Sequence, residues 1–388
     1  MFLDLHILQS FAPANLNRDD TGAPKECVFG GTRRARISSQ SLKRAIREAF
    51  RDQGLLPPER LATRTRRVVD LVTERLTAGG MDAAVARMAV TRALRSVGWS
   101  ISDEGESDAL AFLGDDQVQA IAAAIVAHGA VFTVAADPAP SADGRKGKTK
   151  KETGVEVPIE AVRAIRAALD LAGSIDLALF GRFIADLPGS NVDGSAYVAH
   201  SLGAAALDAE VDYFTAVDEL QQADETGAGM LGLQGYNASI HYRYATLDLR
   251  SLAERLGDPD LVRLAVEAFV AASITAIPGG KQHSFAAFNK PSFVMAVVRG
   301  DAPESLANAY LRPVRTRADG DQMAASVEAL SREWAEHRAM YAANGIRTIA
   351  VAALSEDGLG DLATARTTVP DLIATVGAAC DPREGVVA

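Results

Sequence analysis

Residues 30–50 read GGTRRARISSQSLKRAIREAF, in which two glycines and a short strand pattern lead into a helix pattern. Ser39 suits the N-cap position, because its hydroxyl can accept a hydrogen bond from the first turn. The predicted helix stops near Gly54. Apolar residues recur along it at i, i+3, i+4, i+7 and i+8, which predicts one buried stripe facing a core. This stripe comprises Leu42, Ala45, Ile46, Ala49 and Phe50.

The opposite side of this predicted helix is basic. Residues 30–47 hold six positive side chains and no carboxylate, in a chain whose formal net charge is −10. The first turn of a helix also presents free N–H groups, which suit phosphate. We therefore favour anion binding here over the alternative of a solvated amphipathic helix. At about 100° per residue, the face roughly 150° from the apolar stripe carries Gln40, Lys43, Arg44 and Arg47.

The strand before the helix adds to this charge. Arg34 and Arg36 share one face of an extended segment, and Arg33 lies on the other face. Ser38 adds a hydroxyl donor, and the preceding Gly30-Gly31 pair would let a ligand backbone approach closely. A local stripe of positive charge is sufficient for phosphate contact, so the acidic total does not exclude a nucleic-acid partner.

The bulk composition describes an ordinary globular protein with room for more than one domain. The chain has 388 residues, of which 48% are hydrophobic and 23% are charged. It has only two cysteines, without CxxC spacing, which fits a reducing cytoplasm and favours neither disulfides nor a zinc site. No apolar run approaches the roughly 20 residues of a membrane span. An early acid and no basic segment argue against a secretory signal in the first residues.

Strand and helix patterns alternate around the opening segment. Residues 2–10 and 240–247 alternate as half-buried strands, 293–298 reads as a buried strand, and 346–354 as another. Helices are predicted at 323–343 and 372–378. Residues 59–172 are predicted to form a mostly helical insertion, and residues 138–151, which include no apolar residue larger than Ala, are predicted to form a loop within it. Residues 226–232 read as a flexible tip between two arms. The order of elements predicts an α+β core with a helical insertion and a projecting hairpin.

Four runs in register carry a resemblance that covers the chain to about residue 300 and, more loosely, its remainder. They are NRDD at 17–20, FGGTRRARISSQSLKR at 29–44, DYFTAVD at 212–218 and PGGKQHSFAAFN at 278–289. Together they resemble the Cas-seven family (CasC, or Cse-four), the backbone subunit of type I-E CRISPR Cascade complexes. Any one run alone would be weak, and the four in order are specific.

The resemblance implies an α+β fold of three parts. These are a palm that is RRM-like, also called ferredoxin-like, a helical fingers insertion and a thumb β-hairpin. The expected boundaries are 1–56 for the first part of the palm, 57–174 for the fingers, 175–206 for the second part of the palm, 207–237 for the thumb, and 238–388 for the third part of the palm with C-terminal elements.

The resemblance also implies a non-catalytic function in antiviral defence. Copies of the chain would polymerise head-to-tail along the spacer of a CRISPR RNA (crRNA) and present it in short segments for pairing with target DNA. Because base pairing reads the sequence, the protein needs grips for phosphate and sugar but no base-reading code. The implied partners are crRNA, target DNA, copies of itself, the subunits at the crRNA 5′ and 3′ ends, the small and large subunits, and indirectly a helicase-nuclease. No membrane, cofactor or metal is implied.

Matching positions to the family's motifs gives the candidate RNA-binding residues. Phe183, in LFGRF at 179–183, stands where the family often has Met, and Tyr213 stands where it commonly has Trp. The ring of Phe183 keeps a stacking surface, although the change from Met weakens the one-to-one transfer, and Tyr213 keeps the flat ring of Trp. With Arg34 and Arg36, which come from the charge pattern, the RNA-binding candidates are Arg18, Arg34, Arg36, Ser38, Gln40, Lys43, Arg44, Arg47, Phe183, Tyr213, Phe214, Thr215, Lys281 and Gln282.

Two other groups of residues admit different interpretations. Related subunits of type III complexes use an early acid to cut RNA with a metal, so Asp19 and Asp20 could be catalytic, although an acid pair beside Arg18 more often caps a turn. A metal-dependent RNA-cleaving subunit is therefore the first alternative, and a generic single-strand RNA-binding protein the second. The six histidines show no metal spacing. A basic loop could contact target DNA or be simply solvated; it contains Arg145, Lys146, Lys148, Lys150 and Lys151.

Overall fold

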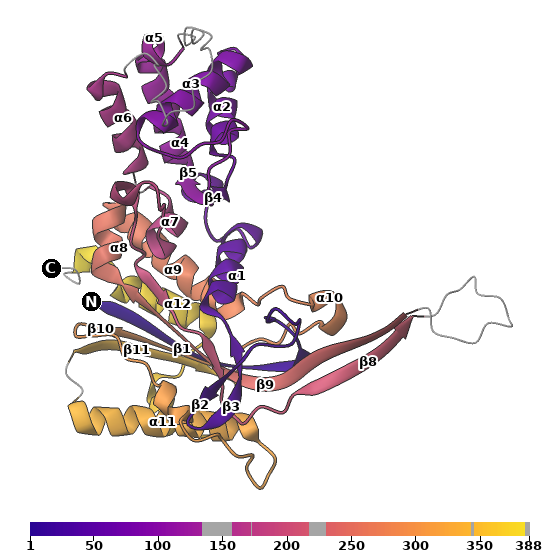
Figure 1. The fold of residues 1–388 in the computed structure, drawn as a ribbon. Helices are drawn as coiled ribbons and strands as arrows, with labels where there is room; N and C mark the ends of the chain where they lie inside the picture. The colour runs from indigo at the N-terminus through magenta and orange to yellow at the C-terminus, as the bar shows by residue number, and fades with distance from the viewer. Residues whose placement is uncertain (134–156, 172, 217–229, 343–344, 385–388) are drawn as a thin grey trace, which may run out of the picture. The chain divides into compact units, whose positions relative to one another are not determined.

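The chain has a mixed α+β fold built around a large antiparallel sheet, as its element pattern predicts. The computed structural model describes residues 1–133, 157–171, 173–216, 230–342 and 345–384 (Figure 1). Its contacts separate two compact units. The first comprises Met1–Leu56 with Ser195–Ala388, and the second comprises Pro57–Gly194. None of the described helices is long and apolar enough to cross a membrane.

A nine-stranded antiparallel sheet forms the first unit. The strand order is β11-β10-β1-β9-β7-β3-β2, with β6 and β8 also paired to β9. Four neighbouring strands in the order β10-β1-β9-β7 form its centre. The strands are β1 (Phe2–Ala14), β2 (Glu26–Phe29), β3 (Thr32–Ile37), β6 (Ala196–Val198), β7 (Ser201–Gly203), β8 (Glu210–Ala216), β9 (Met230–Asp248), β10 (Phe293–Arg299) and β11 (Ile346–Ala353).

Helices cover both faces of this sheet (Figure 1). α1, α8, α9 and α12 lie on one face and α11 lies on the other. The longer helices are α1 (Ser39–Asp52), α8 (Leu249–Leu256), α9 (Pro259–Thr275), α11 (Gln322–Tyr341) and α12 (Val369–Ala379). The short ones are α10 (Gln282–Phe285), η3 (Ala307–Tyr310), η4 (Gly360–Ala365) and η5 (Pro382–Glu384).

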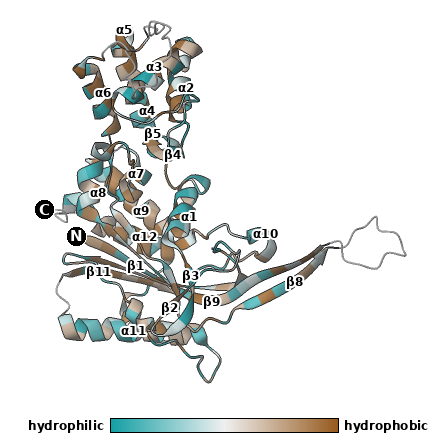
Figure 2. Ribbon diagram, viewed as in Figure 1, coloured by the Kyte–Doolittle hydropathy of each residue, from teal (hydrophilic) through white to brown (hydrophobic). Residues whose placement is uncertain are grey.

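The central strand β1 is buried on both faces, which explains its nearly continuous apolar sequence. Ile7 lies against Leu42 and Ile46 of α1. Its neighbour Leu8 belongs to the cluster that contains Trp334 of α11. Successive residues of a strand point to opposite faces, so β1 contributes to two hydrophobic layers. Figure 2 shows β1 and β11 coloured mostly as hydrophobic, with the polar side of α11 turned outward.

β8 and the first half of β9 form a hairpin at the expected position of the thumb. β9 is a single strand of 19 residues, so one strand forms both a hairpin arm and a central strand of the sheet. The expected tip at 226–232 falls partly within this strand, because Met230–Gly232 belong to β9. Residues 217–229 lie outside the described residues.

The second unit is mostly helical around its own apolar core. Val68, Val72 and Leu76, which show the helical spacing in the sequence, are all buried in that core. A two-stranded sheet also occurs there, and the sequence patterns missed it. The elements are η1 (Pro58–Arg60), β4 (Ala62–Thr65), α2 (Val68–Ala78), α3 (Ala83–Ser96), β5 (Ala111–Gly114), α4 (Asp115–Ala127), α5 (Gly129–Phe132), α6 (Ile159–Leu169), α7 (Ile175–Phe180) and η2 (Pro188–Ser190).

The Gly30-Gly31 pair makes the tight turn between β2 and β3. Both glycines have positive φ, 57° and 75°, as a two-residue hairpin turn with two left-handed positions requires. A Cβ at Gly30 would lie 1.7 Å from the carbonyl oxygen of Leu311. Gly30 is therefore required by the turn and by close packing against Leu311. A Cβ at Gly31 would meet nothing within 4 Å, so the approach of a ligand backbone to this pair stays a prediction.

Candidate nucleic-acid interface

α1 buries the five residues of the predicted stripe, Leu42, Ala45, Ile46, Ala49 and Phe50. Burial of a large apolar side chain stabilises a fold by about 1.5–3 kcal/mol, so this face fixes the helix on the unit. The N-cap is Ser38 and not Ser39 as predicted: Ser38 Oγ accepts a hydrogen bond from the Ser41 N–H at 3.3 Å. Ser38 is buried, so its hydroxyl serves the helix start.

A cavity of about 490 Å³ lies beside the basic side of α1. Three segments that are distant in sequence form its walls: the loop after β1, the exposed side of α1, and the Gly-Gly turn before α10. Its lining is mainly polar and includes two of the candidate cations, Arg18 and Arg44. We call this cavity the α1 groove. Its residues are Leu16, Asn17, Arg18, Asp19, Ser41, Arg44, Ala45, Glu48, Pro278, Gly279 and Gly280.

Side-chain hydrogen bonds hold the loop after β1 in place. Asn17 Oδ1 accepts the Ser38 N–H at 2.8 Å, which joins the loop to the start of α1. Asp19 Oδ1 accepts from the Thr21 N–H, the Thr21 hydroxyl and the Ala23 N–H, at 2.9, 2.7 and 3.0 Å. The hydrogen bond from the Thr21 hydroxyl is the main cause that lowers the pKa of Asp19. The Asp19 carboxylate therefore caps this turn.

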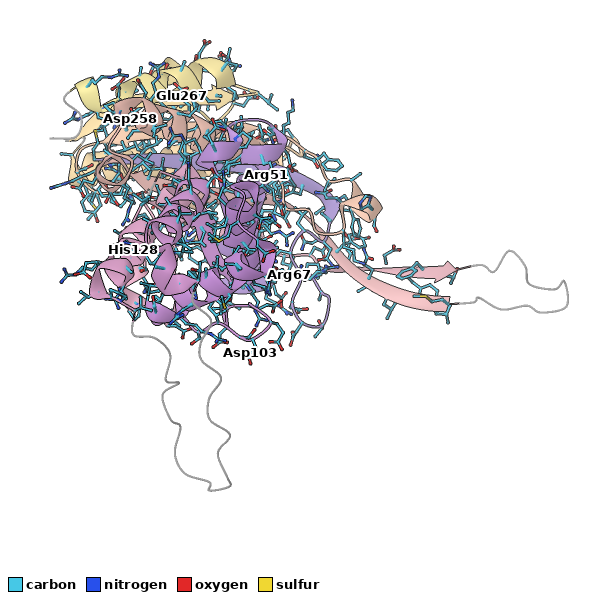
Figure 3. The ribbon with its side chains drawn as sticks, turned by 90° about the horizontal axis from the view of Figure 1, so that it is seen from above. Arg51, Arg67, Asp103, His128, Asp258 and Glu267 are labelled. Atoms are coloured by element: carbon cyan, nitrogen blue, oxygen red, sulfur yellow. The ribbon has the colours of Figure 1, made fainter. Side chains whose placement is uncertain are left out.

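The candidate side chains on α1 differ in exposure. Gln40 and Arg44 are exposed, whereas Lys43 and Arg47 are half-buried. Arg44 Nε donates to Glu48 Oε1 at 2.7 Å, so an acid just beyond the basic stretch accompanies this cation within the groove. Burial lowers the pKa of the Lys43 ammonium. Figure 3 shows Arg51, a further cation, in the last turn of the same helix.

Arg34 is not part of the exposed surface, which corrects its place among the candidates. Its side chain is 0% exposed, and its guanidinium donates to four backbone carbonyls. Nη1 donates to Gly203 and Ala204, both at 3.0 Å, and Nη2 donates to Tyr310 at 2.9 Å and to Leu311 at 3.5 Å. Arg34 therefore joins β3 to the end of β7 and to η3.

Arg36 keeps a surface position at the edge of β3. Its Nε donates to the Glu26 carbonyl at 3.1 Å, and its Nη1 contacts His200 Nδ1 at 2.9 Å. Lys25 lies nearby, because the Arg36 N–H donates to the Lys25 carbonyl at 3.0 Å. Sequence reasoning missed Lys25 and His200 as neighbours of this cation. Lys25 lies between two of the four matching runs and could have been found from its place beside them.

The PGGKQ turn forms the far wall of the α1 groove. A Cβ at Gly280 would lie 2.3 Å from the carbonyl oxygen of Leu16, so glycine permits the contact between the two loops. Lys281 is exposed and has a φ of 54°, which is unusual for a residue other than glycine. Gln282 Nε2 donates to Pro278 at 3.2 Å and to Ala287 at 3.4 Å. Gln282 therefore closes this turn, while Lys281 remains available to a ligand.

The hairpin exposes the three thumb candidates. Tyr213 is 61% and Phe214 is 39% exposed, and Thr215 is exposed as well. The Phe214 ring lies across Gly232 of the paired strand, where a Cβ would be 2.3 Å from the ring. The Tyr213 ring is mostly exposed, and the Phe214 ring is exposed in part. Both rings therefore offer a surface for stacking.

The remaining candidates lie elsewhere. Phe183 belongs to the second unit and is 75% exposed, beside the buried Arg182, whose guanidinium donates to backbone carbonyls and to Gln117. Among the described residues, no group of three His, Cys, Asp or Glu side chains is arranged to hold a metal ion. The basic loop lies outside the described residues; its members are Arg145, Lys146, Lys148, Lys150 and Lys151.

Comparison with known proteins identifies the family. A family model described as CT1975-like protein matches residues 3–375. The chain belongs to the CT1975-like family. The comparison with curated proteins gives no match.

Two solved structures resemble this CT1975-like chain over nearly its whole length. One is a chain of a "CRISPR RNA-guided surveillance complex, pre-nicking", with 29% identity, a TM-score of 0.77, and coverage of 98% of this chain and 100% of that one. The other is a chain of a "CRISPR RNA-guided surveillance complex", with 25% identity, a TM-score of 0.61, and coverage of 98% and 99%. The α1 groove of the CT1975-like chain thus lies in a fold that these complexes share.

Proposed function

We propose that this chain is a component of a CRISPR RNA-guided surveillance complex, and specifically the Cas-seven backbone subunit of a type I-E Cascade. The family match and the two full-length structural matches support this proposal. The α1 groove carries it physically, because the cations Arg18 and Arg44 border a cavity large enough for a phosphate-sugar strand.

The strand order supports an RRM-like, or ferredoxin-like, palm. β1, α1, β7, β9, α9 and β10 follow one another along the chain, and their strands lie in the order β10-β1-β9-β7. This is a split βαβ arrangement with one helix after the first strand and one before the last. The helical second unit, Pro57–Gly194, would contain the fingers, which we expect at 57–174, and the β8–β9 hairpin would be the thumb.

The proposed chemistry is sequence-blind binding of guide RNA. Arg18 and Arg44 would contact phosphates from opposite walls of the α1 groove, and Lys281 would contact them from the PGGKQ turn. None of these contacts reads a base edge, so guides of any sequence bind alike. The exposed rings of Tyr213 and Phe214 would support a nucleotide displaced from the guide.

Several copies of the chain would bind one guide in head-to-tail order and leave short segments free to pair with target DNA. The partners would then be crRNA, target DNA, further copies, and the other Cascade subunits. The proposal includes no catalysis, and the role of Asp19 as a turn cap supports this.

One experiment separates this proposal from its alternatives. The purified chain is incubated with a labelled guide RNA and magnesium, and the RNA is then probed. Protection at a regular spacing supports a backbone subunit. Cutting that Asp19→Ala or Asp20→Ala abolishes supports a metal-dependent ribonuclease. Binding without filaments whose length follows the RNA supports a generic single-strand binder.

Substitutions at Arg44 and Glu48 should change the affinity for RNA in opposite directions. Arg44→Gln should weaken binding of any single-stranded RNA and reduce the slope of log K against log salt by about 0.7, the value for one lost phosphate contact. Glu48→Gln should tighten binding, because it removes a carboxylate from the same groove. Fluorescence anisotropy at several salt concentrations measures both. A change in preference between guide sequences would contradict the assignment of phosphate contacts.

The thumb prediction separates folding from function. Phe214→Ala should change the free energy of unfolding by no more than about 0.5 kcal/mol, since the ring lies on an exposed hairpin. The protection pattern on guide RNA should nevertheless lose its regular spacing. Chemical footprinting of assembled filaments checks this, with Val211→Ala, another exposed apolar residue of β8, as the matched control.

A further proposal concerns target DNA. Arg145, Lys146, Lys148, Lys150 and Lys151 would add sequence-blind affinity for the incoming duplex. Replacing all five by glutamine should flatten the salt dependence of target binding by the assembled complex, because the slope scales with the number of phosphates contacted. An unchanged slope of log K against log salt would contradict this proposal and favour the alternative that the loop is simply solvated.

A further inference from the structure

His200 directly precedes β7 and lies beside two cations, Arg36 and Lys25. β3 and β7 are in antiparallel register, with Arg36 opposite Leu202 and Ile37 opposite Ser201. One more step in this register places His200 beside Ser38, the N-cap of α1. Ser201, the next residue, is fixed from both sides, since its Oγ accepts the Ile37 N–H at 3.1 Å and contacts His241 Nδ1 at 2.9 Å.

The contact with Arg36 fixes which nitrogen of His200 carries the proton. A guanidinium can only donate hydrogen bonds, so His200 Nδ1, 2.9 Å from Arg36 Nη1, must be the acceptor. In the neutral ring the proton therefore lies on Nε2. Nε2 is a donor with no protein partner among the described residues, and the side chain is exposed. The imidazole thus presents an N–H donor outward next to Arg36.

The charged groups that face His200 are both cations. They are Arg36 from β3 and Lys25 from the loop before β2. Burial, followed by repulsion from these two cations, lowers the pKa of His200. The carboxylate of Glu26, the residue after Lys25, pairs with Arg33 on the other side of the strand. The ring is therefore neutral in the free protein at neutral pH, within a patch that attracts anions.

We propose that His200, Arg36 and Lys25 form a second phosphate-binding site, next to the α1 groove, and that His200 takes up a proton when RNA binds there. The inference rests on the proposed function, which supplies the polyanion. A phosphate against Arg36 and Lys25 cancels the repulsion that keeps the ring neutral. Nε2–H then donates to the phosphate, and protonation at Nδ1 from solvent makes this a charge-assisted hydrogen bond while Arg36 turns to the same anion.

Thermodynamic linkage follows from this site. RNA binding raises the pKa of His200 from its lowered free value, so binding takes up protons at any pH between the free and bound values. Binding should tighten as the pH falls through this window. Above it the ring is neutral in both states, and below it the ring is charged in both states, so the affinity becomes independent of this group at either end.

The test uses the full chain and a fluorescein-labelled single-stranded RNA of mixed sequence. Affinity is measured between about pH 6 and pH 8. Proton uptake is measured by calorimetry near neutral pH in buffers of different ionisation enthalpy. The variants are His200→Gln, which keeps an N–H donor without titrating, Arg44→Gln in the α1 groove, and the control His128→Gln, in the second unit (Figure 3). Far-UV circular dichroism confirms that each variant is folded.

Wild type and His128→Gln should take up a fraction of a proton and bind several-fold more tightly at the lower pH. His200→Gln should lose that uptake and bind about fivefold more weakly at the lower pH, because a neutral hydrogen bond replaces a charge-assisted one. If Arg44→Gln weakens binding while His200→Gln changes neither affinity nor uptake, the inference is overturned and the proposed function stands. If no variant changes binding, both are overturned.

Discussion

Arg34→Met should lower the free energy of unfolding of the first unit by roughly 4 kcal/mol. The guanidinium is 0% exposed and donates to carbonyls of Gly203, Ala204, Tyr310 and Leu311. Methionine fills much of the same volume but donates nothing. A buried carbonyl left without a partner costs about 1–3 kcal/mol. Part of this loss is offset, because the variant no longer buries a charge.

Arg33→Met is the matched control, because it changes the adjacent residue in the same strand. Arg33 is exposed and its partner is the Glu26 carboxylate. An exposed pair of this kind contributes about 0–1 kcal/mol, so this variant should unfold almost like wild type. A loss of similar size for both variants would contradict the role that we assign to Arg34.

The measurement must report the first unit alone, since a chain of two units need not unfold in one step. The chain has two tryptophans. Trp334 is buried against the sheet of the first unit, and Trp99 is buried in the core of the second. In a Trp99→Phe background, Trp334 fluorescence during urea unfolding follows the first unit. RNA binding by Arg34→Met under folding conditions should remain close to wild type, because no donor of Arg34 reaches the surface.

Acid should unfold the first unit well before the carboxylates titrate. His6 and His241 are 1% and 4% exposed, and burial lowers the pKa of each from 6.5 to about 3. A group with a lower pKa in the folded state contributes its full stability above the unfolded value. That stability is lost as the pH falls below 6.5, because only the unfolded chain takes up the proton. At about pH 5 the loss is about 2 kcal/mol for each histidine.

Local contacts explain why both rings stay neutral. His6 Nδ1 lies 2.9 Å from the Tyr242 hydroxyl, which accepts the Leu306 N–H at 3.0 Å and so keeps its own proton for the ring. His241 Nδ1 lies 2.9 Å from Ser201 Oγ.

Asp4 changes the pH dependence of stability in the opposite direction. Burial raises its pKa, so its protonation favours the folded state as the pH falls. Variants therefore measure the histidine contribution better than the total pH dependence does.

The expected result is a difference between pH profiles. His6→Gln and His241→Gln should each lose stability at neutral pH, yet each should show a weaker fall between about pH 6.5 and pH 5. Urea unfolding followed by Trp334 at a series of pH values gives these profiles. The control is His283→Gln, which removes an exposed histidine and should keep the wild-type profile. Parallel profiles for wild type and both buried variants would show that these rings do not control acid unfolding.

The apolar stripe of α1 was predictable because helical periodicity depends on the order of residues alone. All five of its residues are buried as expected. The N-cap differed by one position, since Ser38 and Ser39 suit it equally and the end of β3 decides between them. The β4–β5 pair was missed because each strand has only four residues, too few for a period of two to be distinguished.

The groove and the second phosphate site could not be predicted in the same way. Their walls come from loops that lie far apart in the sequence, such as Asn17 and Gly280, and only the sheet brings them together. The Gly30-Gly31 pair illustrates the same limit. Its positive φ values belong to a hairpin turn, and its contact with Leu311 appears only when η3 is placed against β3.

The sequence by itself determined that α1 has one apolar and one basic face, because the spacing of residues in a helix is a local property. The tertiary structure decided what each arginine of β3 does. Arg33 pairs with an acid at the surface, Arg34 is buried on four carbonyls, and Arg36 stands beside His200. The three side chains have the same chemistry and differ only in the long-range contacts that surround them, and a charge acquires its role from its burial and its partners.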